Sequence, residues 1–114
     1  RIVDLPSDFM MSVKKWKFGK RYAFESLTGL PPTNNAVNKQ LRRYLEKRNS
    51  KHITFHGLRH THASYLLSQD IAIQYVSERL GHADVNITLS TYAHLLEKKR
   101  TAETTKTLDV LKNL

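Results

Sequence analysis

A histidine and an arginine three residues apart, His56 and Arg59, form the pair of side chains in this 114-residue sequence best suited to chemistry on an anion. The guanidinium presents five fixed N–H donors, which match the non-bridging oxygens of a phosphate. A neighbouring imidazole can add a donor or move a proton near neutral pH. Because the surrounding residues have helical spacing, both side chains share one flank of a predicted helix. The spacing therefore predicts a pair that handles phosphate.

The predicted helix also has an apolar stripe beside this flank. With about 100° between successive residues, Leu58, Tyr65 and Leu66 fall close together, and we expect them to pack against the core. Thr54 can cap the start of the helix. The flank expected to be presented rather than packed comprises His56, Arg59, His60 and Ala63.

Two motifs downstream add another histidine and an oxygen nucleophile: Leu80-Gly81-His82 and Thr91-Tyr92-Ala93-His94. Gly81 is placed to end a helix in the left-handed conformation, which would set His82 just past a helix C-terminus. In this order and spacing, the motifs resemble those of the tyrosine site-specific recombinases, the integrases of phages and conjugative transposons. Three motifs in register are far more specific than one His-x-x-Arg pair, and the resemblance spans residues 54–95.

The resemblance implies a catalytic role for four residues. Tyr92 would be the nucleophile that attacks a DNA phosphate and forms a 3′-phosphotyrosine link, so that rejoining needs no ATP. Arg59 would clamp the scissile phosphate and stabilise charge in the transition state. His56 would act as general base or hydrogen-bond donor, and His82 as a second donor to the phosphate. Neither a metal nor a cofactor is implied, and the expected partners are duplex DNA and other protomers in a synaptic tetramer.

The sequence also departs from the family pattern. Integrases of this type carry another catalytic arginine upstream and a lysine on a β-hairpin, and neither has a matching position here. We therefore expect residues 1–114 to be the C-terminal portion of a single catalytic domain, without the amino-terminal DNA-binding domains and impaired on its own.

The composition favours a polyanionic partner. Nineteen Lys and Arg residues against ten Asp and Glu residues give a formal charge of +9, and neutralising phosphates releases counterions. The sequence has no cysteine, which favours a reducing, cytoplasmic compartment, and its apolar runs are too short for a membrane span. With 39% hydrophobic residues and few glycines and prolines, the chain is expected to be ordered and mainly α-helical.

The fold class predicted is mainly α with a short N-terminal β element over Arg1–Pro6, and residues 21–24 are either an edge strand or a connector. The residues predicted to cap helices are Ser7 or Asp8, one of Thr33, Asn34 and Asn35, then Thr54, Asp70 and Asp84. After a charged stretch that starts at Glu97, an apolar stripe ends the chain, so residues 97–114 are predicted to form a detachable tail helix that docks in cis or on a neighbouring molecule.

One predicted helix has a basic outer face, which is either a solvated surface or a set of contacts to the DNA backbone. We take the second as the hypothesis, because such contacts position a protein on DNA without reading its sequence. The residues of this basic face are Lys39, Arg42, Arg43, Lys47 and Arg48.

Other readings stay open from the sequence. The remaining tyrosines, Tyr22, Tyr44, Tyr65 and Tyr75, are assigned to packing. His60 and His94 are interpreted either as packing residues or as residues that hold the catalytic side chains in place. A metal site formed by His56, His60 and His62 is a weaker alternative, because no acidic or cysteine ligand stands close in sequence. The chain could also be a non-catalytic basic DNA-binding module of the same shape, or, less attractively, a relative of nucleases or type IB topoisomerases.

Overall fold

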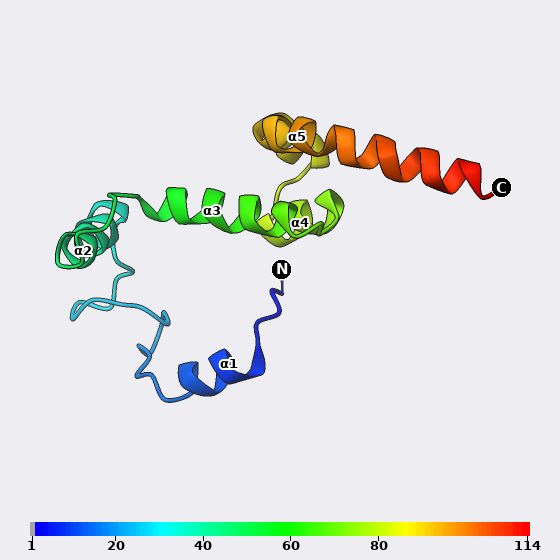
Figure 1. The fold of residues 1–114 in the computed structure, drawn as a ribbon. Coiled ribbons are helices and arrows are strands. Elements are labelled where there is room, and N and C mark those ends of the chain that lie inside the picture. The colour runs from blue at the N-terminus through cyan, green and yellow to red at the C-terminus, as the bar shows by residue number, and fades with distance from the viewer. Residues whose placement is uncertain (1) are drawn as a thin grey trace. The chain divides into compact units, whose positions relative to one another are not determined.

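The computed structural model describes residues 2–114, and within this range it contains five α-helices joined by irregular segments (Figure 1). Their bounds are α1 Ser7–Val13, α2 Asn34–Glu46, α3 Phe55–Ser68, α4 Ile73–Leu80 and α5 Val85–Lys112. The described chain falls into two compact units that divide between Leu58 and Arg59, inside α3. The first unit holds α1 and α2, and the second holds most of α3 together with α4 and α5.

The predicted mainly α class is confirmed, but the short β element is not seen. Residues 2–6 form no strand, and Arg1 lies outside the described residues. Residues 21–24 are a connector, because the backbone amides of Arg21 and Tyr22 donate to the Glu25 carboxylate instead of to a neighbouring strand. A strand is stabilised by pairing its backbone groups, and residues 2–114 contain no strand for either segment to pair with.

Three of the predicted helix caps are confirmed. The Thr33 hydroxyl accepts from the Ala36 amide at 3.2 Å, and the Thr54 hydroxyl accepts from the Gly57 amide at 3.0 Å. At the start of α5, the Asp84 carboxylate accepts from the Asn86 amide at 2.9 Å. Each satisfies a backbone N–H that the first turn of a helix leaves without a partner. In contrast, α1 begins after Pro6 without a side-chain cap.

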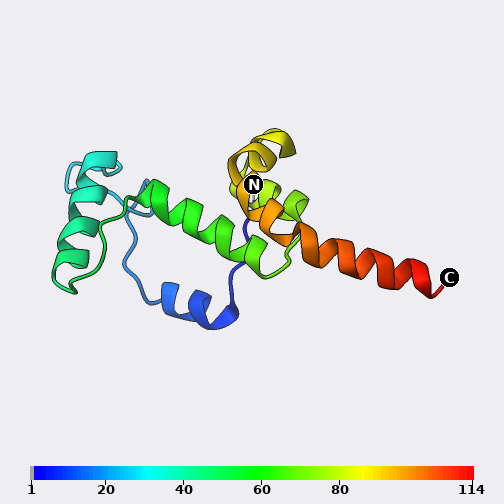
Figure 2. The same cartoon turned by 45° about the horizontal axis from the view of Figure 1, so that its top comes forward.

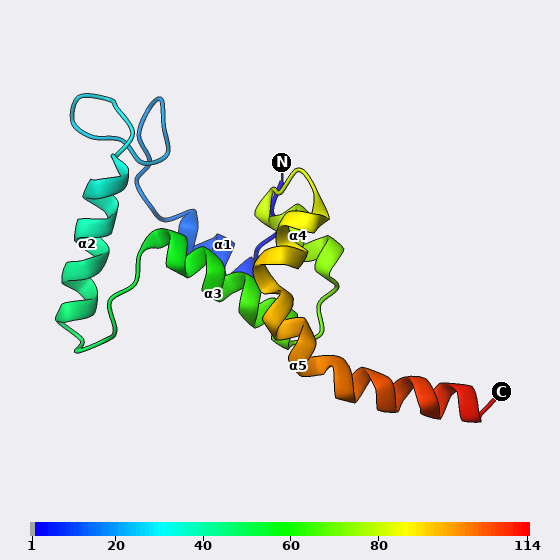
Figure 3. The ribbon, with the colours of Figure 1, turned by 90° about the horizontal axis from the view of Figure 1, so that it is seen from above.

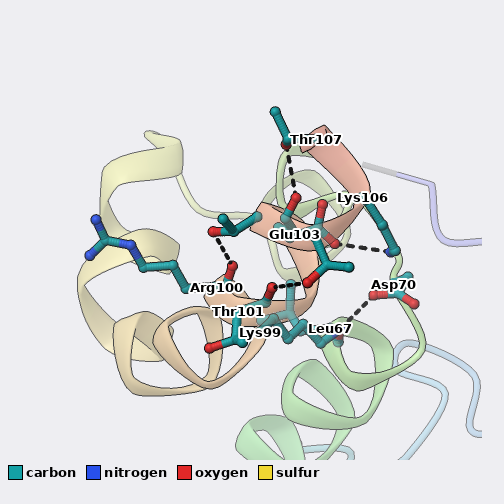
Figure 4. Close-up of polar contacts among 10 residues, drawn as sticks. Leu67, Asp70, Lys99, Arg100, Thr101, Glu103, Lys106 and Thr107 are labelled. Carbon is teal, nitrogen blue, oxygen red and sulfur yellow. Dashed lines mark hydrogen bonds and ion pairs between the residues drawn. The ribbon is translucent and has the colours of Figure 1, made fainter. Parts of the chain in front are cut away.

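The sequence predicted that Asp70 caps the helix that follows it, and this prediction is wrong. Helix α4 starts later, with Ala72 at its N-cap, and Asp70 adopts a left-handed backbone with φ 61°. Its carboxylate instead accepts from the Lys99 ammonium at 2.8 Å, and this hydrogen bond lowers the pKa of Asp70. Lys99 also donates to the Leu67 carbonyl near the end of α3 (Figure 4). The Lys99 side chain therefore ties α5 to the turn that follows α3.

The core of the second unit is small and draws on three helices. Its buried apolar side chains are Ala63, Leu67, Val76, Leu80 and Tyr92, with Leu66, Ile73 and Leu95 packed against them. Helix α4 lies against α5 (Figure 2). A core of this size supports only modest stability, so each buried side chain contributes a substantial share.

The packing side of α3 differs in part from the sequence prediction, since Leu66 packs against the core as expected but the other two residues of the predicted stripe do not. Ala63 is fully buried, whereas Leu58 and Tyr65 are 38% and 63% exposed. The side of α3 that packs against the core thus includes Ala63, which lies on the flank that the sequence predicted to be exposed. Both flanks of α3 carry apolar residues, so periodicity alone could not decide which one packs.

Helix α5 is continuous through the charged stretch that was predicted to precede a separate tail. Its backbone departs from helical geometry at Tyr92, with φ −110° and ψ 16°. Beyond that bend, α5 runs on away from α4 (Figure 3). The apolar residues of the predicted tail are all exposed: Leu108, Val110, Leu111 and Leu114. Within residues 2–114, no helix combines the length and the apolar character needed to cross a membrane.

Replacing Gly81 with alanine is expected to lower the free energy of unfolding by about 1–2 kcal/mol, because a Cβ is disfavoured in the left-handed conformation. Gly81 ends α4 with φ 76°, and its amide donates back to the Glu78 carbonyl at 2.9 Å. Urea denaturation of the chain measures the difference.

Gly57→Ala is the matched control. Gly57 is helical, and a Cβ there would meet the side chains of Ile53 and Thr54 at ordinary contact distances of 3.5 and 3.6 Å. Higher helix propensity should make this variant up to about 1 kcal/mol more stable. Equal losses of stability in the two variants would contradict the role given to Gly81.

Candidate active site

Arg59 lies on α3 in the second unit, where its guanidinium reaches the end of α4. Its Nη2 donates to the Leu80 carbonyl at 2.6 Å, and both groups are partly buried. The carbonyls at a helix C-terminus carry the negative end of the helix dipole, which favours a cation there. One of the five guanidinium donors is used in this bond, so the side chain is fixed while others remain for an anion.

His82 is positioned by the turn that follows α4. Gly81 provides the left-handed residue, and the His82 amide donates to the Ser77 carbonyl at 3.1 Å. The imidazole Nδ1 lies 2.6 Å from the hydroxyl of Thr88, which is fully buried in α5. Burial, and secondarily the positive charge of Arg59, lowers the pKa of His82 below its ordinary value. The neutral form of this imidazole is therefore favoured more than it is in an ordinary histidine.

Tyr92 lies at the bend in α5 with its side chain turned into the core, where it is 3% exposed. Its hydroxyl lies 2.9 Å from Nδ1 of His60, and the two rings meet edge to face with centroids 5.9 Å apart. Burial raises the pKa of Tyr92, while the charge of Arg59 acts in the opposite direction. The phenol is therefore protonated at neutral pH, and its ionised form would be stabilised by the nearby guanidinium.

The second unit brings together three of the four residues with predicted catalytic roles. Arg59 is close enough to both His82 and Tyr92 for its charge to shift the pKa of each. The fourth residue, His56, is exposed on the first turn of α3 and belongs to the first unit.

The predicted basic face also belongs to the first unit, on α2 and the turn after it. Its members, Lys39, Arg42, Arg43, Lys47 and Arg48, are all exposed. The Arg48 guanidinium lies over the Tyr44 ring, 3.8 Å from its centroid, which restricts that side chain.

Two further side chains belong to this site, and the sequence assigned neither of them a partner. His60 was interpreted either as a packing residue or as a support for the catalytic ones, and its imidazole contacts the Tyr92 hydroxyl from a position 32 residues away in the chain, as the second alternative allows. No local pattern indicates such a pairing. Thr88 precedes Tyr92 by four residues, a spacing that places both on the same face of a helix, so its approach to the site was open to prediction.

The histidines of α3 are not arranged around a common point in the described structure. His62 accepts from Nε of Arg79 at 3.0 Å, while His60 contacts Tyr92. Among residues 2–114, no three histidine, cysteine or acidic side chains are grouped so that they could hold a metal ion. A guanidinium, a neutral imidazole and a phenol form a set suited to binding an oxyanion and attacking it with an oxygen nucleophile.

Comparison with known proteins finds relatives of this chain. The family model described as "Phage integrase family" matches residues 1–99. The integrase of Staphylococcus phage L54a is 32% identical over 105 residues, covering 86% of this chain and 30% of the integrase. Transposase A from transposon Tn554 of Staphylococcus aureus (strain Mu50) is 35% identical over 107 residues, covering 93% of this chain and 27% of the transposase.

A tyrosine recombinase of Agathobacter rectalis is 37% identical over 78 residues, which cover 68% of this chain and 25% of that protein. The chain thus spans less than a third of the length of the curated relatives it matches. No solved structure matches it.

Arg59→Gln is expected to raise the pKa of His82 toward its ordinary value without fully restoring it, because burial is the larger cause of the lowering. A histidine with a lowered pKa contributes stability that is present above its unfolded pKa and is lost as the pH falls through its folded pKa. The variant should therefore lose less of its stability on acidification. NMR titration of the imidazole measures the pKa directly.

Arg79→Gln is the matched control, because it also removes one arginine charge. Arg79 lies on α4 and its side chain donates to His62. We expect this variant to leave the His82 titration unchanged. An equal shift in both variants would show that the overall charge of the protein, rather than the position of Arg59, sets the pKa.

Proposed function

The chain belongs to the phage integrase family, and on that premise we propose that it forms the C-terminal part of the catalytic domain of a tyrosine recombinase. The proposed activity is site-specific cleavage and rejoining of duplex DNA through a covalent 3′-phosphotyrosine intermediate. The observation that carries this proposal is geometric: the Arg59 guanidinium is bound to the Leu80 carbonyl, His82 follows that carbonyl by two residues, and Tyr92 lies in the same core as Leu80.

Cleavage exchanges one phosphodiester for another. The Tyr92 oxygen forms a bond to phosphorus, the bond to the 5′ oxygen of the leaving strand breaks, and a proton moves to that oxygen while the phenol loses its own. Rejoining reverses these steps, with the 5′ hydroxyl attacking the phosphotyrosine. The number of phosphodiester bonds is conserved, so no energy source is required.

Arg59 would stabilise the charge that develops on the non-bridging oxygens. Its donors are planar and permanently charged, which suits an anionic transition state better than an ammonium group does. Its bond to the Leu80 carbonyl holds the guanidinium in place before DNA arrives. Preorganised donors cost little rearrangement when charge develops.

His82 would donate a second hydrogen bond to the phosphate. A neutral imidazole carries one N–H, and the Thr88 hydroxyl can donate to Nδ1, which leaves the proton on Nε2. Nε2 would then carry the N–H that is proposed to bind the phosphate. We assign His56 the role of general base or further donor, on the strength of its place in the His-x-x-Arg motif.

The complete protein is proposed to supply what this chain lacks. A further arginine and a hairpin lysine have no counterpart among these residues, so the isolated chain is expected to be impaired. The proposed partners are duplex DNA bearing a recombination site and other protomers in a tetramer, with the tail at residues 97–114 available to dock in cis or on a neighbour. We place the reaction in the cytoplasm, with neither metal nor cofactor.

The burial of Tyr92 favours a second candidate function. A tyrosine that is 3% exposed and hydrogen-bonded inside a core is what a purely structural residue looks like. The chain would then be a non-catalytic DNA-binding module that retains the shape of the domain. This candidate and the enzyme differ in a single measurable property, the covalent bond to DNA.

Tyr92→Phe in the complete protein is expected to abolish the covalent adduct with a nicked recombination-site DNA, because no other group replaces the phenol oxygen. Detergent-resistant complexes on a denaturing gel measure the adduct. Loss of the hydroxyl should leave the ring packed and the affinity for DNA nearly unchanged.

Tyr75→Phe is the matched control, because Tyr75 is 49% exposed on α4. It should form adduct at the wild-type rate. An adduct that persists in Tyr92→Phe would refute the nucleophile, and a wild-type protein that binds the DNA without forming any adduct would favour the non-catalytic module.

Removing two charges from the basic face, Arg43→Gln with Lys47→Gln, is expected to weaken DNA binding by a similar factor for all sequences. The slope of the logarithm of affinity against the logarithm of salt concentration should decrease in magnitude by about one unit for each phosphate that the variant no longer neutralises. Titration of the complete protein with duplexes of different sequence, at several salt concentrations, measures both effects.

Lys98→Gln with Lys112→Gln removes the same charge from exposed positions on α5. We expect a much smaller change in the salt dependence for this pair. Identical changes in the two double variants would mean that net charge alone drives binding, and the basic face would then have no special role.

A further inference from the structure

The hydroxyl that is proposed to attack DNA is held by a side chain that has no part in the roles assigned so far. His60 Nδ1 lies 2.9 Å from the Tyr92 hydroxyl, and the imidazole edge meets the phenol ring. His60 follows Arg59 directly on α3, so the helix that positions the phosphate clamp also positions this imidazole.

In this arrangement Tyr92 cannot reach a DNA phosphate. Its side chain is 3% exposed, in a core cluster with Leu67 and Val76. A nucleophile must come within bonding distance of phosphorus, so the phenol has to leave the core before it can react. Leaving the core breaks the contact with His60.

The segments of α5 before and after Tyr92 are both anchored, so release of the phenol from the core would involve the backbone between them. Upstream, the start of α5 is capped by Asp84, and Thr88 contacts His82. Downstream, Lys99 binds the Leu67 carbonyl and Asp70 (Figure 4). Between these anchors the backbone of Tyr92 already lies outside the helical region, in the sparsely populated bridge region. The residue to be released is thus the one whose helical geometry is already interrupted.

Resting on the proposed role of Tyr92 as nucleophile, we propose that His60 is a positioning residue that keeps the Tyr92 hydroxyl withdrawn in the core, so that DNA cleavage requires this hydrogen bond to break. A buried hydroxyl without a partner is costly, and His60 supplies the partner. The bond therefore stabilises the withdrawn tyrosine relative to the released one. Removing it should raise the released fraction by roughly tenfold, the factor expected from an unsatisfied buried hydroxyl.

The test uses the complete protein with saturating nicked duplex DNA, so that the rate of adduct formation is separated from DNA affinity. His60→Leu should form adduct about tenfold faster than wild type, with the dissociation constant for DNA unchanged. His60→Asn can accept a hydrogen bond near the position of Nδ1, and it should bring the rate back toward that of wild type. His94→Leu, at an exposed position on α5, is the control for loss of an imidazole.

A spectroscopic readout separates positioning from general structural support. The tyrosinate absorbance of the complete protein, minus that of its Tyr92→Phe variant, reports the titration of Tyr92 alone. Burial raises the pKa of Tyr92 in the wild type. In His60→Leu the titration should move down toward the ordinary value for tyrosine, because the phenol is released to water, and in His60→Asn it should stay high.

The outcomes distinguish this inference from the proposed function. An adduct rate in His60→Leu that equals or falls below that of wild type, while Tyr92→Phe still abolishes the adduct, overturns the role of His60 alone. An adduct that survives in Tyr92→Phe overturns the nucleophile itself. Should His60→Leu fail to fold, His60→Gln is the substitute variant. Its amide lies near the position of Nε2 and not of Nδ1, so it keeps a polar side chain without the bond to Tyr92, and it is expected to raise the rate of adduct formation in the same way.

Discussion

The burial of one aromatic side chain, Tyr92, links the packing of the second unit to its candidate active site. Its ring completes a core of only five buried apolar residues and brings α5 against α3 and α4. Because that core is small, the unit depends on this contact more than a large domain would. The same contact sets the electrostatics of the site, since it places the phenol near the Arg59 guanidinium and gives its hydroxyl to His60. Structural support and proposed chemistry thus reside in one residue.

The turn after α4 imposes the second constraint. Gly81 closes the helix in a left-handed conformation, and the Leu80 carbonyl just before it accepts from Arg59. His82, just after it, is held by the buried Thr88 hydroxyl. A short stretch of backbone therefore fixes both the guanidinium and the imidazole. This explains why the glycine and histidine occur as a unit in the motif, while the arginine is distant in sequence.

The sequence was sufficient where a local signal decided the structure. The family resemblance, drawn from three motifs in register, is confirmed, as are the Asp84 cap and the left-handed Gly81. The misses have long-range causes. Residues 2–6 form no strand because a strand needs a partner, and Asp70 is engaged by Lys99 from 29 residues away instead of capping α4. The packing side of α3 was set by its neighbours, and no periodicity indicated that His60 would meet Tyr92.

The proposed nucleophile, Tyr92, is also a core residue, so it would have to be released against the packing that holds it. Exposing a large side chain costs about 1.5–3 kcal/mol, and losing a buried hydrogen bond adds a comparable amount. On the proposed role of His60, this cost adds to the barrier to adduct formation even when DNA is bound, so weakening the contact should change the rate and leave the affinity for DNA unchanged. The charge of +9 would then serve DNA binding separately, through the phosphates it neutralises. The burial of Tyr92, which by itself argues for a structural residue, would thus be a means of limiting the rate of the proposed DNA cleavage.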